Sequence, residues 1–412
     1  MVDSVGIGSD FPIRIQTMAN TDTNDIDASV RQAQRCIEAG AEIIRFTTQG
    51  SREAESLHEI HTLLYKHLSL PGEGSSDTSA YHHTIPLVAD VHFNPNVADL
   101  AAQYVEKVRI NPGNYIDPAR VFKHIDYTDE EYNAELLRLK ERFTRLLNIC
   151  KQHHTALRIG VNHGSLSDRI MSRYGDTPAG MVESCMEFLR VAVEEQFYNI
   201  VLSIKASNTR VMVETVRLLV AEMDKADMHF PLHLGVTEAG EGEDGRIKSA
   251  VGIGALLADG IGDTIRVSLS EEPEAEIPVA RALRDYFTDP DSIRYHGVSL
   301  ALNEDSLIYS SPQPSWPLFQ LQAAAELGKW LLAPTDPISP ISPISPISPI
   351  SPTPSSLSSQ DLLDSSPKVG EVPLAGEGYE HLPIYKFTNL QIINSNFSPE
   401  KLDTLRKDIL QA

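Results

Sequence analysis

Residues 157–169, LRIGVNHGSLSDR, carry the side chains whose types and spacing have the clearest chemical meaning in this sequence. A short apolar run holds a single arginine, Arg158, and leads directly into Asn162, His163 and a glycine. An arginine inside a strand is costly to bury, but a guanidinium with an amide and an imidazole just beyond the strand is well suited to holding an anion. The stretch therefore predicts an anion site at the end of a strand.

The elements that must position this site alternate regularly from residue 13 to about residue 286. Short β-branched runs, the expected strands, cover 13–18, 42–46, 85–90, 107–110, 156–160, 199–204, 231–236 and 264–267. Longer amphipathic stretches, the expected helices, cover 26–39, 53–67, 97–104, 129–153, 178–195, 209–225, 247–258 and 274–286. Eight strand–helix units in fewer than 290 residues predict an α/β fold, the (βα)8 TIM barrel, whose catalytic groups come from the carboxyl ends of the strands.

Five expected strands end in a cation: Arg45, Arg109, Arg158, Lys205 and Arg266. A single arginine at a strand end more often forms a surface ion pair. Five cations on one rim would repel one another and would be costly to bury without anions. We therefore expect them to lack internal counterions and to bind a phosphate-bearing ligand, which guanidinium groups contact in bidentate geometry.

Other residues at the strand ends allow more than one interpretation. Asp90 and Glu238 are candidate general acids or bases, or else ion-pair partners of the arginines. His163 is either catalytic or a residue that stabilises a turn. The acidic, glycine-rich residues 238–246 predict a flexible loop that acts as a lid or docking surface. Gly252 and Gly254 lie inside a helical pattern and predict close packing rather than dinucleotide binding.

The sequence changes character after residue 286. Two short strands are expected within 289–309, one helix over 318–332, a strand over 390–393 and a short helix from residue 399. A Ser-Pro-Ile repeat between them places proline at every third position, which predicts an extended linker. The expected domains are a barrel over 1–288, the start of a partly disordered inserted domain over 289–336, a Pro/Ser-rich linker over 337–370 and an incomplete C-terminal segment over 371–412.

Composition excludes several classes of function. A net charge of -22 and a pI near 5.0 argue against nucleic acid or an anionic membrane as a partner. The sequence shows neither a secretory signal nor an apolar run of about 20 residues, so we expect a cytoplasmic protein. Cys36, Cys150 and Cys185 are widely spaced within helical patterns, which predicts buried, reduced thiols and no metal site.

Several long strings identify a family. They are PIRIQTMANTDT (12–23), PLVADVHFNP (86–95), VRINPGN (108–114), LRIGVNHGSLSDRIMSRYGDTP (157–178), SIKASN (203–208), LHLGVTEAGEGEDGRIKSAVGIGALL (232–257) and GDTIRVSLSEEP (262–273). From residue 6 to residue 283 the chain resembles hydroxymethylbutenyl diphosphate synthase, the iron–sulfur reductase of the non-mevalonate isoprenoid pathway, in its three-domain variant. The resemblance implies reductive ring opening of methylerythritol cyclodiphosphate to hydroxymethylbutenyl diphosphate.

The resemblance also implies roles for individual residues. Those expected to hold the diphosphate are Arg109, Arg158, Lys205, Arg266 and Ser268, with Arg45 at a matching position. Asn111 and Asn162 would contact the substrate. Glu238 would act as acid or base near the reacting carbon, and Asp90 and His163 complete the expected catalytic set.

The family uses a [4Fe-4S] cluster held by three cysteines and a glutamate in a C-terminal domain. The three cysteines of this chain match none of those ligands. We therefore expect an N-terminal portion that binds the cyclic diphosphate but is inactive alone. The resemblance further implies ferredoxin or flavodoxin as electron donor, and a homodimer where the cluster domain is present.

Two alternatives remain open from the sequence. One is a barrel enzyme of the dihydropteroate synthase kind, which also places a diphosphate at the mouth and would show condensation activity. The other is a non-catalytic ligand-binding fragment, for which Arg158→Ala would leave ligand affinity unchanged.

Overall fold

The computed structural model describes residues 1–68, 85–116, 127–296, 298–303, 306–311, 313–332 and 389–412. The linker expected over 337–370 and the first part of the segment expected over 371–412 lie outside these residues. Within the described ranges, no helix combines the length and the apolar character needed to cross a membrane.

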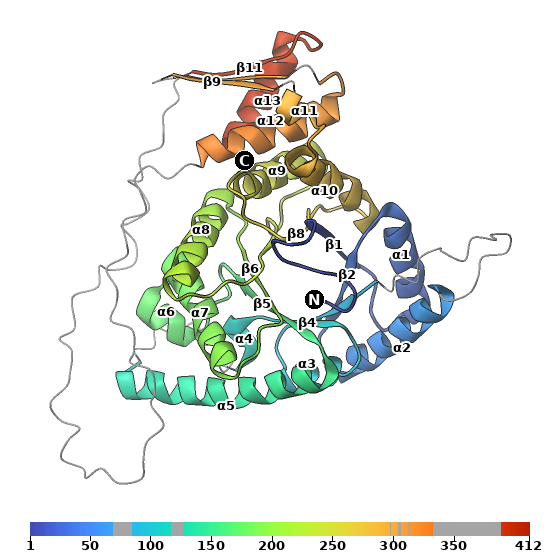
Figure 1. The fold of residues 1–412 in the computed structure, drawn as a ribbon, viewed down its shortest axis with the longest axis vertical. Helices are drawn as coiled ribbons and strands as arrows, with labels where there is room; N and C mark the ends of the chain where they lie inside the picture. The colour runs from blue at the N-terminus through green and yellow to red at the C-terminus, as the bar shows by residue number, and fades with distance from the viewer. Residues whose placement is uncertain (69–84, 117–126, 297, 304–305, 312, 333–388) are drawn as a thin grey trace. The chain divides into compact units, whose positions relative to one another are not determined.

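Parallel strands form the centre of the fold. The described chain places eight of them in one sheet, in the order β6-β5-β4-β3-β2-β1-β8-β7. They are β1 (Arg14–Met18), β2 (Ile43–Thr48), β3 (Leu87–Val91), β4 (Lys107–Ile110), β5 (Ala156–Asn162), β6 (Ile200–Lys205), β7 (His233–Leu234) and β8 (Thr264–Ile265). A parallel bridge between Leu202 and Leu232 joins the two edges of the sheet. The strands thus close into the inner ring seen in Figure 1, which confirms the predicted TIM barrel.

Helices surround this ring (Figure 1). They are α1 (Ile26–Ala39), α2 (Ser51–Leu68), α3 (Pro95–Ala101), α4 (Pro112–Tyr115), α5 (Asp129–His153), α6 (Asp168–Tyr174), α7 (Pro178–Glu194), α8 (Thr209–Lys225), α9 (Gly242–Ala258) and α10 (Pro273–Thr288). The bounds of α1, α5 and α8 match the expected ones because capping residues mark them in the sequence. In α5, for example, Thr128 and Glu131 form a reciprocal capping box at the first turn.

The N-terminal residues fill one end of the barrel. Val2 and Val5 pair across a tight turn. Val2 and Ile7 pack against residues near the amino ends of the strands, among them Ile43, Val88 and Val201. The amino end of the barrel is therefore closed by apolar side chains, and polar chemistry is left to the opposite end.

Helix α9 corrects one prediction. The segment 238–246 was expected to be a flexible loop, but α9 begins at Gly242. Glu243 and Asp244 lie in the first turn of this helix, where negative charge interacts favourably with the helix dipole. The glycines of this segment obscured the helical pattern, and only residues 238–241 remain as a loop.

The elements after the barrel are α11 (Ile293–His296), β9 (Ser299–Asn303), β10 (Ser306–Ser310), α12 (Trp316–Leu331), β11 (Asn389–Ile393) and α13 (Pro399–Gln411). The described residues form a three-stranded sheet in the order β11-β10-β9, so both expected strands within 289–309 and the strand at 390–393 are confirmed. Helix α12 packs directly on α9, because Gly254 leaves no side chain in the way: a Cβ there would lie 2.6 Å from the Cα of Ala325. This contact confirms the close-packing interpretation of Gly254.

Candidate anion-binding site

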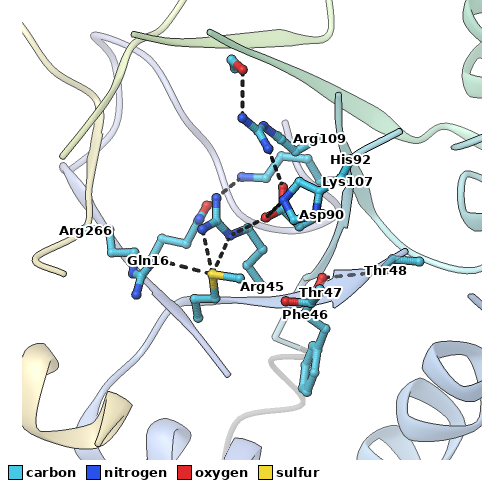
Figure 2. Close-up of polar contacts among 12 residues, drawn as sticks. Gln16, Arg45, Phe46, Thr47, Thr48, Asp90, His92, Lys107, Arg109 and Arg266 are labelled. Atoms are coloured by element: carbon cyan, nitrogen blue, oxygen red, sulfur yellow. Dashed lines mark hydrogen bonds and ion pairs between the residues drawn. The ribbon is translucent and has the colours of Figure 1, made fainter. Parts of the chain in front are cut away.

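The five predicted cations lie together inside the carboxyl end of the barrel. Side chains alternate between the two faces of a strand, so Arg45 points inward while its neighbours Ile44 and Phe46 pack among the core side chains outside the barrel. Figure 2 shows Arg45 and Arg109 turned toward each other and Phe46 turned away. Arg109 and Arg158 are partners in the register of β4 and β5. The structure therefore brings together residues that are more than 200 positions apart in the sequence.

Four of the five cations are almost completely buried. The exposed fractions are 8% for Arg45, 3% for Arg109, 1% for Arg158 and 8% for Lys205, and Arg266 is half-buried. Burial lowers the pKa of Lys205 well below its ordinary value, and the neighbouring Arg45 and Arg158 lower it further. An excess of positive charge has thus been gathered in a space with little water to screen it.

Asp90 at the end of β3 is the centre of this cluster. Its Oδ1 lies 3.0 Å from Nη1 of Arg109, and its Oδ2 lies 3.6 Å from Nε of Arg45 and 3.4 Å from Nε2 of His92. Figure 2 shows these groups converging on the carboxylate. The expectation that the cations lack internal counterions was therefore wrong for Arg45 and Arg109. Of the two interpretations of Asp90, the ion pair is the one that the structure shows.

A second carboxylate, that of Glu276 on α10, forms an ion pair with Arg266. Its Oε2 lies 3.4 Å from Nε of Arg266, so this cation also has an internal partner, contrary to expectation. Oε1 of Glu276 accepts a hydrogen bond from the backbone N–H of Leu269 at 2.8 Å. Met18 Sδ lies 3.2 Å from Nε of Arg45 and 3.4 Å from Nη1 of Arg266, which places the two arginines side by side.

Burial and charge shift the pKa of these groups in different directions. Burial opposes ionisation of Asp90, but Arg45 and Arg109 outweigh it and hold the pKa of this carboxyl well below its usual range. Burial lowers the pKa of Arg45 to about 10, against the opposing effect of Asp90. Burial raises the pKa of Glu276, and Arg266 only partly reverses that effect. Asp90 is therefore ionised at neutral pH.

Arg158 and Lys205 have no such partner. No carboxylate of the described residues forms an ion pair with either of them, and Nε and Nη1 of Arg158 have no hydrogen-bond acceptor there. Burial lowers the pKa of Arg158 well below its ordinary value, and Arg45 and Arg109 lower it further. Because a buried guanidinium with free donors is costly, these two cations are the part of the cluster that an anionic ligand would stabilise.

Two glycines make room for the cations. A Cβ at Gly160 would lie 2.6 Å from Nε of Arg109, and a Cβ at Gly235 would lie 2.8 Å from Nζ of Lys205. In addition, the carbonyl oxygen of Gly160 accepts a hydrogen bond from Nη2 of Arg109 at 2.8 Å. Glycine at 160 in β5 and at 235, directly after β7, is thus explained by the space that the charged side chains occupy.

The remaining predicted residues lie around the mouth of the barrel. Asn111 caps α4 by accepting from the N–H of Gly113 at 3.1 Å, and its Nδ2 donates to Oγ of Ser165 at 2.9 Å. Asn162 can place its amide oxygen 3.3 Å from Nη2 of Arg109. Asn111 therefore joins the residues after β4 to the loop after β5, and Asn162 lies beside the arginine cluster.

His163, Glu238 and Ser268 are more peripheral. The His163 side chain is 40% exposed, and its Nε2 lies 3.7 Å from Oδ1 of Asp176. Glu238 is exposed and has a left-handed backbone with φ of 52°, while Ser268 is half-buried beyond β8. The structure does not bring His163 or Glu238 into contact with the cations.

Three residues close to the cations, two inside the barrel and one on a helix, were missed by sequence reasoning. Lys107 and His233 are fully buried, and each lies two positions before a residue already placed inside, Arg109 and Gly235 respectively. The period of two in a strand could have identified both. Glu276 lies on a helix, and no pattern in the sequence associates it with Arg266.

The depressed pKa of Asp90 leads to a prediction about acid stability. A carboxyl whose folded pKa lies below its unfolded value, about 3.9, adds stability above that pH and loses it as the pH falls toward the folded value. We expect urea denaturation to show a steeper loss of unfolding free energy below about pH 5 for the unmodified chain than for Asp90→Asn. The raised pKa of Glu276 changes the stability with pH in the opposite direction. This contribution is present in both proteins, so it cancels in the comparison. Parallel profiles for the two proteins would contradict the ion-pair role of Asp90.

Comparison with known proteins now places the barrel in a family. A model of the GcpE TIM-barrel domain matches residues 1–281. The chain belongs to the GcpE family. It is 63% identical over 311 residues to 4-hydroxy-3-methylbut-2-en-1-yl diphosphate synthase (flavodoxin) of Bacteroides fragilis, an alignment covering 76% of this chain and 47% of that protein.

A plant member of the GcpE family is also similar. The chain is 51% identical over 288 residues to the chloroplastic 4-hydroxy-3-methylbut-2-en-1-yl diphosphate synthase (ferredoxin) of Arabidopsis thaliana, covering 70% of this chain and 37% of the plant protein. The chain thus spans about half the length of the bacterial relatives it matches, and less of the plant one.

Among solved structures, dihydropteroate synthase of Stenotrophomonas maltophilia is similar with a TM-score of 0.43 at 11% identity, covering 68% of this chain and 94% of that one. That similarity is too low to support an argument about ligand or activity.

The iron–sulfur cluster implied by the resemblance finds no fitting ligands in the described part of this GcpE chain. Burial raises the pKa of the Cys36 thiol to about 12 and likewise that of Cys150 and Cys185, and all three are buried in separate helices. The prediction of buried thiols is confirmed. Across the described ranges no three His, Cys, Asp or Glu side chains are grouped to bind a metal ion. No step of the chemistry is therefore assigned to a cluster here.

Proposed function

We propose that this chain is the substrate-binding barrel of an enzyme that reductively opens 2-C-methyl-D-erythritol 2,4-cyclodiphosphate to 4-hydroxy-3-methylbut-2-enyl diphosphate. The observation that carries the proposal is the pair of buried cations, Arg158 and Lys205, that have no carboxylate partner among the described residues. A diphosphate supplies the missing negative charge. Membership of the GcpE family and the names of the relatives support this choice of ligand.

The residues of the cluster have different roles in binding. Arg158 and Lys205 contact the diphosphate directly, while Arg109, Arg45 and Arg266 add charge from positions fixed by Asp90 and Glu276. Ser268, Asn111 and Asn162 contact the substrate at the rim. Asp90 is ionised at neutral pH, so its contribution is to orient Arg45 and Arg109 rather than to donate a proton.

Proton transfer is assigned to groups at the mouth. Glu238 lies exposed on the loop between β7 and α9, where it can approach a ligand held below it. His163 occupies the loop after β5 and serves as a second candidate acid or base. Both act on the substrate carbon skeleton while the cations hold the phosphates.

The electrons come from outside the barrel. In the whole enzyme a [4Fe-4S] cluster would supply them, held by residues other than the described ones of this chain. The names of the relatives specify flavodoxin or ferredoxin as the electron donor. The enzyme would act as a homodimer that contains both the barrel and the cluster domain. The barrel contributes binding and orientation of the cyclic diphosphate.

Calorimetric titration of the purified chain tests this function. We expect saturable binding of the cyclic diphosphate and of inorganic pyrophosphate, and none of methylerythritol, because the phosphates provide the attraction. We also expect no reductive turnover with a chemical electron donor. Condensation activity with a pterin diphosphate would instead support the dihydropteroate synthase alternative. Failure to bind either diphosphate, or turnover without added cluster protein, would contradict the proposal.

A further inference from the structure

A group of buried donors lies deeper in the barrel than the Asp90 carboxylate. Lys107 precedes Arg109 by two residues on β4, so it faces the interior one pleat closer to the closed amino end. It is fully buried, and its Nζ lies 3.2 Å from Oε1 of Gln16 across the barrel. Figure 2 shows Lys107 reaching toward Gln16. No carboxylate of the described residues forms an ion pair with this lysine.

The side chains around Lys107 also have buried polar atoms without hydrogen-bond partners in the described structure, and those of Gln16 and Arg158 are donors. In the described part of the chain, Nε2 of Gln16, Nε and Nη1 of Arg158 and Nε2 of His233 have no hydrogen-bond partner. Each of these residues is at most 1% exposed. The other ring nitrogen of His233 is occupied by Oγ1 of Thr264 at 3.0 Å. One region of the interior therefore presents several hydrogen-bond donors and a deficit of acceptors.

The charges in this region act on one another. Burial lowers the pKa of Lys107 well below its ordinary value, and Arg158 is the neighbouring charge that lowers it most. Burial likewise lowers the pKa of His233, with Lys205 and Arg158 contributing next. The negative charge of Asp90 is paired with Arg109 and Arg45. It therefore does not neutralise Lys107 and Arg158 as well.

We propose that a small monovalent anion of halide size binds inside the barrel between Lys107 and Arg158. It accepts from the ammonium of Lys107, from Nε or Nη1 of Arg158 and from Nε2 of Gln16. Lys107 and Gln16 lie on the amino-terminal side of the pair formed by Asp90 and Arg109, so the anion would bind below the diphosphate. Arg158 is in register with Arg109 and borders both sites, and its two donors without acceptors in the described structure, Nε and Nη1, allow it to contact both anions. The halide site does not depend on the proposed activity: the anion is a resident counterion that stabilises the empty barrel.

Crystals of the full chain soaked in sodium bromide, with and without inorganic pyrophosphate, test the location. The anomalous difference map is expected to show a bromide peak within contact distance of Lys107 Nζ and Arg158 in both crystals. A water molecule with no bromide peak at this position would overturn the proposal. Loss of the peak when pyrophosphate is bound would also overturn it, since the halide would then have occupied part of the ligand site.

Thermal unfolding tests the same site in solution. At constant ionic strength, replacing gluconate by chloride is expected to raise the Tm of the unmodified chain by about 2–3 °C, because the anion binds only the folded state. Gln16→Glu provides a built-in carboxylate next to Lys107, and Lys107→Met removes the charge. Each is expected to abolish the chloride response.

Lys225→Met is the matched control, because the Lys225 side chain is 53% exposed on α8, and its chloride response should equal that of the unmodified chain. The two test variants change the site in different ways. If one of them does not fold, the chloride response of the other still tests the proposal. No chloride response in the unmodified chain would show that no chloride binds the folded protein, and the same response in Gln16→Glu would show that chloride acts elsewhere; either result would overturn the proposal.

Discussion

Asp90→Asn is expected to lower the free energy of unfolding by about 3–5 kcal/mol, because it leaves the buried Arg45 and Arg109 without their shared negative charge. The substitution keeps the shape of the side chain, so the loss comes from charge rather than from packing. Urea denaturation near neutral pH measures it. Pyrophosphate should restore more stability to this variant than to the unmodified chain, since the ligand then replaces the missing carboxylate.

Asp129→Asn provides the control for this result. Asp129 also pairs with an arginine, Arg173, but its side chain is 72% exposed. The change is expected to cost no more than about 1 kcal/mol, as for other surface ion pairs. Equal losses in the two variants would show that burial of the Asp90 cluster has no energetic consequence, contrary to our account.

Arg158→Met is expected to separate binding from stability. Affinity for pyrophosphate should fall by roughly 10- to 100-fold, which corresponds to about 1.5–3 kcal/mol for the lost charge-assisted contacts. In buffer without phosphate and with little halide, the free energy of unfolding should stay unchanged or rise by about 1 kcal/mol. The reason is that the protein provides no acceptor for Nε and Nη1 of Arg158, so an apolar side chain of similar length is better tolerated there.

Arg169→Met is the matched control for Arg158→Met. Arg169 is equally buried, at 2% exposure, but its Nη1 lies 2.6 Å from Oε1 of Glu187, and its guanidinium stacks 4.8 Å from the ring of Tyr132. Removing it leaves the buried Glu187 carboxylate without its positively charged partner, so a loss of about 3–5 kcal/mol in the free energy of unfolding is expected. If Arg158→Met were destabilised to the same extent with no loss of affinity, Arg158 would be a structural residue and not a ligand contact.

The two buried arginines show how the site differs from the scaffold. Arg169 forms an ion pair with Glu187, whereas Arg158 has no carboxylate partner in the described structure. A chain selected only for stability would pair or replace Arg158. Retaining it at a cost in folding free energy is typical of a binding site.

Much of the fold could be predicted from the sequence because its signals are local. The cap at Asp25, the left-handed Gly40 and the capping box of Thr128 mark helix ends to the residue. Two-residue strands such as β7 and β8 carry weaker signals, and their expected ranges were longer than the ladders that form. The glycines before Ile247 concealed the first turn of α9, because local composition favoured a loop. The helix dipole and packing against α12 favour a helix there.

The sequence predicts which cations make up the candidate site, but not which carboxylate pairs with each of them. Strand ends identify Arg45, Arg109, Arg158, Lys205 and Arg266 as neighbours, because the carboxyl ends of barrel strands converge. Which carboxylate neutralises which cation depends on side-chain geometry across strands and on a helix that the pattern does not connect to the site. Glu276 is the clearest case, since it approaches Arg266 from α10. Local sequence carries no information on such contacts.

Whether the unpaired cations of the barrel hold a diphosphate is tested by a crystal structure of the chain with inorganic pyrophosphate. Diphosphate binding by these cations predicts phosphate oxygens within hydrogen-bond distance of Nε or Nη1 of Arg158 and of Nζ of Lys205, with the Asp90 pairs to Arg45 and Arg109 still formed. Pyrophosphate bound elsewhere, or a barrel in which Arg158 and Lys205 have turned to protein carboxylates, would contradict it.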